Sequence, residues 1–91
     1  MVTGIVLVNV ERQKIMEAID SLMKISGVSE VYTVAGEYDL VVMIRVNSNA
    51  ELSDIVANRM TRDIPGIGRT RTLVTLEARS HVDLPKVFGL A

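Results

Sequence analysis

The chain has 91 residues, 48% of them hydrophobic and very few aromatic, with no cysteine and a formal net charge of −1. Its length fits one small domain, and the lack of cysteine excludes disulfides and thiolate chemistry. Nucleic-acid affinity rests on clustered Lys and Arg that neutralise phosphates, so this charge argues against direct nucleic-acid binding.

The first segment, Thr3 to Val10, is mostly β-branched and apolar at successive positions. This pattern predicts a strand that is buried on both faces. The apolar run is broken at Asn9 and a charged stretch follows, so it is too short for a signal peptide or a membrane span. We therefore expect a cytoplasmic protein without membrane contact.

The next segment has the spacing of an amphipathic helix. Apolar side chains recur mainly at steps of three and four residues, and they are Ile15, Ala18, Ile19, Leu22, Met23 and Ile25. Gly27 is the predicted end of this helix, because glycine enters the left-handed conformation without strain.

Two strands joined by a tight turn are predicted next. The segments Val28–Val34 and Asp39–Val46 are rich in β-branched and apolar residues, and Gly36 lies between them. Because the connection is short, we expect the two strands to be antiparallel neighbours.

A second helix and a fourth strand complete the predicted order. Ser48 and Glu51 have the spacing of a capping box, and the helix that they open has an apolar side formed by Leu52, Ile55, Val56 and Met60. Pro65-Gly66 ends this helix, and Thr70 to Ala78 is the predicted fourth strand. The order β-α-β-β-α-β predicts an α+β fold of the ferredoxin-like type, in which a four-stranded antiparallel sheet carries two helices on one face.

One domain is predicted over residues 1–79, followed by a C-terminal tail over residues 80–91. A short internal repeat supports the duplication of a βαβ unit, since Gly27-Val28 and Gly66-Ile67 occupy equivalent places after the two helices. The tail has no periodicity but is apolar, so we expect it to pack on a neighbouring subunit.

The predicted sheet is apolar on both faces. Ile5 and Leu7 alternate with valines along the first strand, and Val41 and Met43 alternate with other aliphatic residues along the third. Two helices cover only one face, and burial of one such side chain is worth about 1.5–3 kcal/mol. We therefore expect a second copy of the chain to cover the other face, so that the protein dimerises through its sheet.

The turn between the second and third predicted strands is the strongest candidate for chemistry. Gly36 permits a tight turn, and Asp39 places a carboxylate where the third strand begins. A fixed negative charge beside turn amides suits the ammonium and carboxylate of a small zwitterion. Without further information, Asp39 is more simply interpreted as a turn residue that bonds nearby backbone amides.

Catalysis and metal binding have little support in the sequence. His81 is the single histidine and lies in the polar stretch 79–81, where a solvated surface residue is expected. No His, Cys or carboxylate ligands converge at metal-binding spacing, and no phosphate loop, nucleophile elbow or dinucleotide motif is present. We predict no catalytic residue, no metal, no cofactor and no enzymatic activity.

Two blocks of sequence resemble the effector-binding (RAM) domain of the Lrp/AsnC family of feast/famine regulators. They are Val31-x-x-Val34-x-Gly36-x-Tyr38-Asp39 and Ile64-Pro65-Gly66-Ile67-x-x-Thr70-x-Thr72. The resemblance implies domains that pair through their sheets, dimers that associate into rings such as octamers, and amino-acid effectors bound between neighbouring dimers. Family members normally carry a helix-turn-helix before this domain, and 91 residues leave no room for one, so we expect a stand-alone domain without operator recognition.

The resemblance implies six ligand-binding residues, which are Gly36, Glu37, Tyr38, Asp39, Thr70 and Thr72. In this role the carboxylate of Asp39, or its adjoining backbone, holds the effector's ammonium, and amides of the Gly36 turn fix the ligand's orientation. Glu37 biases side-chain specificity, and Tyr38 either walls the pocket or packs at the start of the strand.

Thr70 and Thr72 project from one face of the fourth predicted strand. They are either ordinary strand residues or, by the resemblance, contacts to the effector across the interface between dimers. Arg69 and Arg71 face the opposite way and are interpreted as interface or solvent charges.

Together these patterns predict an oligomeric regulatory domain that binds a small amino acid. It would act as a sensor, as a storage protein or as a subunit that mixes with full-length Lrp/AsnC regulators. Two alternatives remain open. One is a small cofactor-free monooxygenase or isomerase of the dimeric α+β barrel type, with His81 or Tyr32 in a pocket between helices and sheet. The other is a purely structural oligomer.

Overall fold

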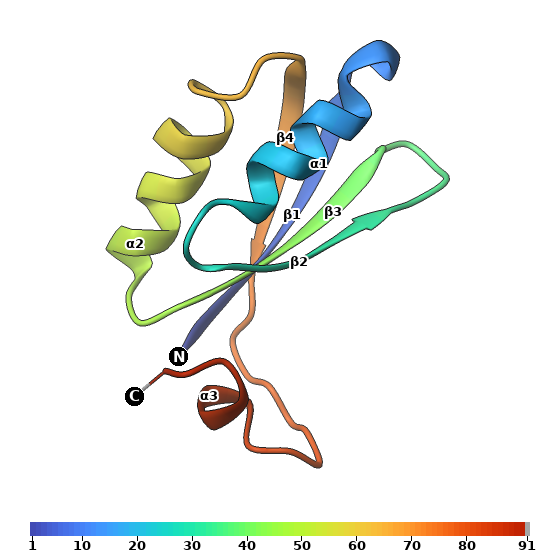
Figure 1. The fold of residues 1–91 in the computed structure, drawn as a ribbon. Helices are drawn as coiled ribbons and strands as arrows, with labels where there is room; N and C mark the ends of the chain where they lie inside the picture. The colour runs from blue at the N-terminus through green and yellow to red at the C-terminus, as the bar shows by residue number, and fades with distance from the viewer. Residues whose placement is uncertain (91) are drawn as a thin grey trace.

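The computed structural model describes residues 1–90 and consists of one sheet with its two main helices on the same side (Figure 1). The strands are β1 (Val2–Val10), β2 (Val28–Thr33), β3 (Leu40–Val46) and β4 (Ile67–Val74). Their order in the sheet is β2-β3-β1-β4, and every neighbouring pair is antiparallel. The predicted ferredoxin-like fold is confirmed.

The first helix, α1 (Ile15–Met23), follows a short 3-10 turn, η1 (Arg12–Lys14). The second, α2 (Asn49–Asp54), continues into a π-helical segment, η2 (Ile55–Met60). Ser48 caps α2 as predicted, because its hydroxyl accepts the Glu51 N–H at 3.2 Å. The reciprocal bond from the Glu51 side chain is not formed within residues 1–90, so only half of the predicted capping box is present. No helix in this part of the chain has the length and apolar content needed to cross a bilayer.

An aliphatic core fills the space between the helices and the sheet. Helix-facing positions of β1 and β3 alternate with positions on the other face, and the largest fully buried side chains are Leu22, Leu40, Ile44, Met60, Val6, Val8 and Val42. With few aromatic residues in the sequence, tight packing of branched aliphatic side chains supplies the core.

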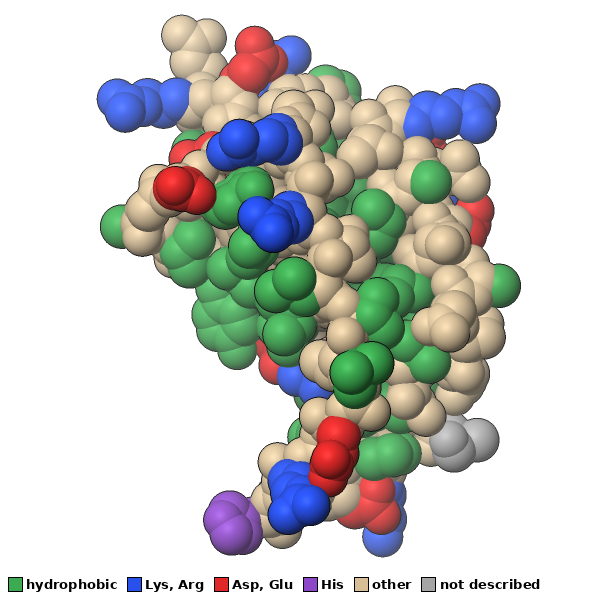
Figure 2. Space-filling view, turned by 180° about the vertical axis from the view of Figure 1, so that it is seen from behind, with side chains coloured by type: hydrophobic (Ala, Val, Ile, Leu, Met, Phe, Trp, Pro, Cys, Tyr) green, Lys and Arg blue, Asp and Glu red, His purple; other side chains and the backbone are tan. Residues whose placement is uncertain are grey.

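The second face of the sheet remains uncovered over its middle, and we call it the open face. It carries half-buried or exposed apolar side chains, namely Ile5, Leu7, Tyr32, Val41, Met43 and Leu73. Tyr32 is 51% exposed and Leu73 is 47% exposed. Figure 2 looks onto this face and shows hydrophobic side chains gathered over its middle, with Lys and Arg above them. The prediction of a sheet that is apolar on both faces is confirmed.

The fourth strand differs from its predicted range of Thr70–Ala78, since β4 spans Ile67–Val74. β4 pairs only with β1. This pairing ends near Thr3, whose carbonyl accepts the Thr75 N–H at 3.0 Å, because few residues of β1 lie beyond Thr3. The early start reflects a bulge, because two residues, Gly68 and Arg69, lie opposite the single residue Asn9. A bulge leaves its extra residue unpaired, and here the pairing of β4 with β1 resumes on both sides of it.

The C-terminal tail forms a short helix, α3 (Leu84–Val87), that the sequence pattern did not predict. Asp83 caps it by accepting the Lys86 N–H at 3.2 Å. The tail returns to the end of β3, where the Arg45 guanidinium lies 4.3 Å from the centre of the Phe88 ring. Packing on a neighbouring subunit remains a prediction, since these contacts lie within one chain.

The turn after α1 yields a test of the fold. Gly27 has a φ of +101°, and a Cβ there would lie 2.8 Å from Val46 Cγ1 and 2.9 Å from Ile55 Cδ1. We expect Gly27→Ala to lower the free energy of unfolding by about 2 kcal/mol or more, through backbone strain and overpacking. Urea denaturation would measure this loss.

Gly68→Ala is the matched control. A Cβ at Gly68 would meet only the Asn9 carbonyl oxygen, at 3.8 Å, and its φ is not positive. We expect this change to alter stability by less than about 0.5 kcal/mol. Equal unfolding midpoints for the two variants would contradict the proposed geometry of the turn.

Candidate functional site

The predicted functional turn, residues 34–39, connects β2 to β3 at one end of the sheet. The Val34 N–H donates to the Asp39 carbonyl at 2.9 Å and closes the turn. Gly36 has a φ of +150°, and no heavy atom lies within 4 Å of the place where a Cβ would be. Glycine is therefore needed here for its backbone conformation, while the space beside it is open.

Four consecutive amides of this turn lack partners. The N–H groups of residues 35–38 donate to no acceptor within residues 1–90. Residues 35–37 are exposed and Tyr38 is half-buried. Exposed backbone amides of this kind are ready donors for an anionic group such as a carboxylate.

Asp39 has a structural role that its turn position predicts. Its N–H donates to the Val8 carbonyl at 2.9 Å, and its Oδ2 accepts the Val10 N–H at 2.8 Å and the Asn9 side chain at 3.4 Å. The carboxylate thus replaces a backbone acceptor where the β1–β3 ladder ends. Its other oxygen, Oδ1, receives no hydrogen bond from residues 1–90 and stays available for a ligand.

Two residues that the sequence analysis did not assign to the site belong to the same group. Asn9 donates to the Glu37 carbonyl at 2.8 Å, and its Oδ1 accepts the Arg69 Nε at 3.2 Å. The Arg69 guanidinium lies 5.0 Å from the centre of the Tyr38 ring. We call Asn9, Tyr38, Asp39 and Arg69 the end cluster. The sequence signal for Asn9 was its position as a polar interruption of an apolar strand.

Thr70 and Thr72 project to the other face of the sheet from the end cluster of the same chain. They pair with Val8 and Val6, which face the helices, so both threonines project to the helix-facing side of β4. Asn9 alternates with those valines and therefore projects to the side of the open face. If the six candidate residues share one ligand, the threonines must come from another copy of the chain.

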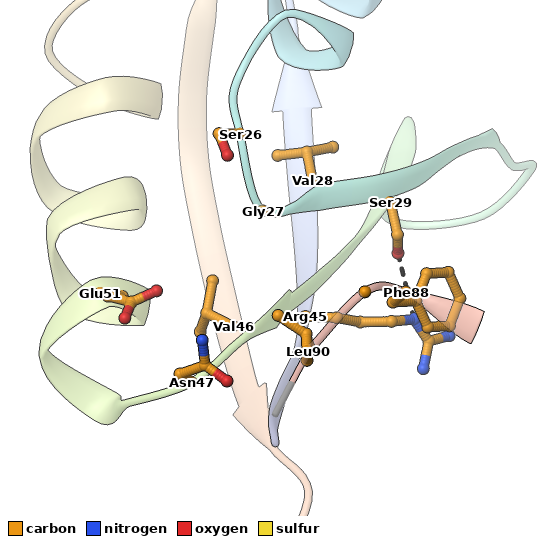
Figure 3. Close-up of a pocket in the computed structure, with 11 residues that line it drawn as sticks. Ser26, Gly27, Val28, Ser29, Arg45, Val46, Asn47, Glu51, Phe88 and Leu90 are labelled. Carbon is orange, nitrogen blue, oxygen red and sulfur yellow. Dashed lines mark hydrogen bonds between the residues drawn. The ribbon is translucent and has the colours of Figure 1, made fainter. Parts of the chain in front are cut away.

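A hollow lies at the opposite end of the sheet (Figure 3). This cavity of about 390 Å³ is lined by residues that include Ser29, Arg45, Glu51 and Phe88. None of the residues 36–39 lines it. Figure 3 shows Arg45 between Ser29 and the Phe88 ring, and the same guanidinium pairs with Glu30 at 3.4 Å. Its charge is therefore already compensated within the chain.

Residues 1–90 place no group of three or more His, Asp or Glu side chains where they could hold a metal ion. His81 is exposed in the tail, and Tyr32 lies on the open face. These two residues, the candidate polar groups of a barrel-type enzyme, do not meet between the helices and the sheet.

Comparison with known sequences identifies the family. The model of the Lrp/AsnC ligand binding domain matches residues 3–83. The HTH-type transcriptional regulator FL11 of Pyrococcus abyssi is 32% identical over 81 residues, which are 88% of this chain and 52% of FL11. An uncharacterized HTH-type regulator of Pyrococcus horikoshii is 39% identical over 59 residues, which are 65% of this chain and 39% of that protein. The chain thus spans about half or less of the length of these relatives.

Solved structures agree with this assignment. TTHA0845 from Thermus thermophilus has a TM-score of 0.82 and 31% identity, covering 89% of this chain and 100% of its own. AsnC of Escherichia coli has a TM-score of 0.80 at 20% identity, covering 90% of this chain and 55% of its own, which supports the fold. The chain belongs to the Lrp/AsnC ligand-binding domain family.

The hydrogen bonds of Asp39 predict a difference between two substitutions. Asp39→Ala removes the acceptor of the Val10 N–H, which is buried, and should lower the free energy of unfolding by about 1–3 kcal/mol. Asp39→Asn retains an oxygen acceptor and should cost clearly less. Urea denaturation of both variants would measure the two losses.

Glu37→Ala serves as the control, because the Glu37 side chain is exposed and forms no hydrogen bond or ion pair within residues 1–90. Its stability should stay within about 0.5 kcal/mol of the parent chain. A parent-like stability for Asp39→Ala would show that the carboxylate does not support the end of the sheet.

Proposed function

We propose that this Lrp/AsnC domain is a cytoplasmic regulatory module that binds a small amino acid, and that binding shifts its self-assembly and so modulates transcription regulation or amino-acid metabolism. The turn of residues 34–39 carries the proposal, because it combines unpaired amides with the Asp39 carboxylate on an exposed end of the sheet. A ligand shifts an assembly equilibrium only through its different affinity for the two states. A site shared between chains supplies that difference.

The chemistry of the turn suits an α-amino acid. Asp39 Oδ1 accepts hydrogen bonds from the ligand's ammonium, and the amides of residues 35–38 are donors for its carboxylate. Glu37 and Tyr38 stand beside these groups and contact the ligand's side chain. Similar proteins support the ligand class: a feast or famine regulatory protein from M. tuberculosis, 26% identical to this chain with a TM-score of 0.73, is complexed with L-methionine.

Other copies of the chain complete the site. Thr70 and Thr72 lie on the helix-facing side of an edge strand, away from the turn of their own chain. In a ring of dimers, such as an octamer, the threonines of one dimer face the turn of the next and close the pocket. Full-length Lrp/AsnC regulators carry the same kind of domain and are candidate partners for mixed assemblies.

The open face is the surface through which two copies pair. Apolar side chains such as Ile5, Leu7 and Met43 cover the middle of this face (Figure 2), while Glu30 and Arg71 lie on the same face on the strands that flank them. Apolar patches beyond a few hundred Å² are rare on monomers. Packing of two such faces about a two-fold axis buries them without a further element from either chain.

The barrel-type enzyme has weaker support. It requires a polar pocket between helices and sheet, whereas that layer is filled by fully buried aliphatic residues such as Leu22, Leu40 and Met60. A purely structural oligomer stays compatible with the fold. It differs from the proposed sensor in one respect, since its assembly and stability would not respond to any amino acid.

A thermal-unfolding panel of the standard L-amino acids tests the sensor. A ligand present at one hundred times its dissociation constant adds about 2.7 kcal/mol of stability, which for a domain of this size raises the midpoint by on the order of 10 °C. We expect at least one amino acid to do so at millimolar concentration. Asp39→Asn, which keeps the acceptor for Val10, should abolish the shift.

Asp20→Asn is the matched control, since Asp20 is an exposed carboxylate on α1 and forms no hydrogen bond within residues 1–90. It should respond to the ligand as the parent chain does. If no amino acid moves the midpoint of the parent chain, the sensor is wrong and the structural oligomer is favoured.

Sedimentation velocity tests the pairing surface. Leu73→Arg places a charge among the apolar side chains of the open face and should convert the oligomer into smaller species, because a desolvated unpaired charge is strongly unfavourable. Met16→Arg is the control: Met16 is 71% exposed on α1, away from the open face. Unchanged assembly in Leu73→Arg, or equal dissociation in both variants, would place the interface elsewhere.

A further inference from the structure

Two opposite charges stand at the same end of the sheet without pairing. Asp39 and Arg69 both contact Asn9, the first through Oδ2 at 3.4 Å and the second through Nε at 3.2 Å. The ion pairs within residues 1–90 involve other residues, so Asp39 and Arg69 do not neutralise each other. The amide group of Asn9 lies between them as a spacer.

The backbone explains why Arg69 reaches this position. At the bulge of β4, Gly68 and Arg69 lie opposite the single residue Asn9, and a bulge redirects the side chain that it carries. The Arg69 guanidinium then rests over the Tyr38 ring, 5.0 Å from its centre. One hydrogen bond and one stacking contact therefore fix the guanidinium beside the turn.

Arg69 and Asp39 each have hydrogen-bonding atoms that no partner within residues 1–90 uses. Arg69 uses Nε for Asn9, while its two terminal nitrogens form no hydrogen bond within residues 1–90. Asp39 uses Oδ2 for the Val10 N–H, and Oδ1 stays unused among the same residues. A guanidinium with two unused donors binds a carboxylate well, and an unused carboxylate oxygen binds an ammonium.

We infer that Arg69 binds the α-carboxylate of the effector while Asp39 binds its α-ammonium, and that Asn9 is the positioning residue that keeps the two protein charges apart. This inference rests on the proposed amino-acid site and adds a second charged anchor to it. The ligand class becomes narrower, because a molecule must carry a free ammonium and a free carboxylate on the same α-carbon. Amino-acid amides and N-acetylated amino acids lack one of the two charges.

The turn amides are the competing anchor for the ligand's carboxylate. If they act alone, the loss of the Arg69 charge leaves binding unchanged. If Arg69 acts, its loss weakens only ligands that carry the carboxylate. The pair formed by an amino acid and its α-carboxamide separates these two cases, since both keep the same side chain and the same ammonium.

Isothermal titration calorimetry provides the test, with the standard L-amino acids as probes and the α-carboxamide of the tightest binder as the comparison ligand. We expect Arg69→Gln to weaken binding of the amino acid by about tenfold or more, and binding of its carboxamide by less than about twofold. Arg69→Lys keeps the charge without the planar fork and should fall between the parent chain and Arg69→Gln.

Arg62→Gln is the matched control, because Arg62 is an exposed arginine after η2 that forms no hydrogen bond or ion pair within residues 1–90. It should bind both ligands as the parent chain does. Asn9→Ala tests the spacer: with Asn9 shortened, Arg69 and Asp39 can pair, and the preference for the amino acid over its carboxamide should fall toward one. A purely structural role of Asn9 would weaken both ligands equally.

The outcomes separate this inference from the proposed function. If the parent chain binds an amino acid, Asp39→Asn does not, and Arg69→Gln binds within about twofold of the parent chain, the turn amides alone hold the carboxylate and the inference is overturned. If the parent chain binds no amino acid at all, the proposed function and the inference fail together.

Discussion

The sheet of this molecule is apolar on both faces, but its own helices cover only one of them, and the rest of the structure depends on this constraint. Val6 and Val8 of β1 face the helices and are fully buried, whereas Ile5 and Leu7, which alternate with them, are less deeply buried on the open face. A small domain gains a modest stability from a single core, so exposure of a second apolar surface is costly in both stability and solubility. The proposed pairing of two copies would bury this second surface. The candidate turn of residues 34–39 lies at an end of the same sheet, so the proposed site would be next to the proposed interface between copies.

At that end of the sheet, the fold and the candidate site use the same residues. Asp39 supplies the acceptor that the Val10 N–H would otherwise lack, and Asn9 ties the Glu37 carbonyl to β1. A carboxylate held by such bonds is already oriented before any ligand arrives, so little ordering entropy is lost on binding. The structural and the ligand-binding interpretations of Asp39 are therefore not exclusive. Oδ2 supports the end of the sheet, and Oδ1 is the atom that we propose binds the ligand.

The sequence predicts the features that depend on local pattern, and it fails where distant segments meet. Gly27 and Gly66, which the internal repeat places before equivalent strands, both have positive φ, at +101° and +90°. The alternation along β1 and β3 predicts the open face correctly. By contrast, the bounds of β4 depend on where β1 ends, which no pattern within residues 70–78 contains. The contact between Asn9 and Arg69 joins residues 60 positions apart, through a bulge that periodicity does not reveal.

Each end of the sheet carries an arginine, but only one of the two has its charge neutralised within the chain. This difference decides which end suits a zwitterion. At the end of β3, Arg45 is hydrogen-bonded to Ser29, paired with Glu30 and covered by the Phe88 ring, so its charge is satisfied although it borders a cavity of about 390 Å³. At the start of β4, Arg69 has one bond to Asn9 and a ring beneath it, and the nearby Asp39 is held from it by the same asparagine. Recognition of two opposite charges needs two unneutralised partners at a fixed separation, and the end cluster supplies such a pair in Asp39 and Arg69.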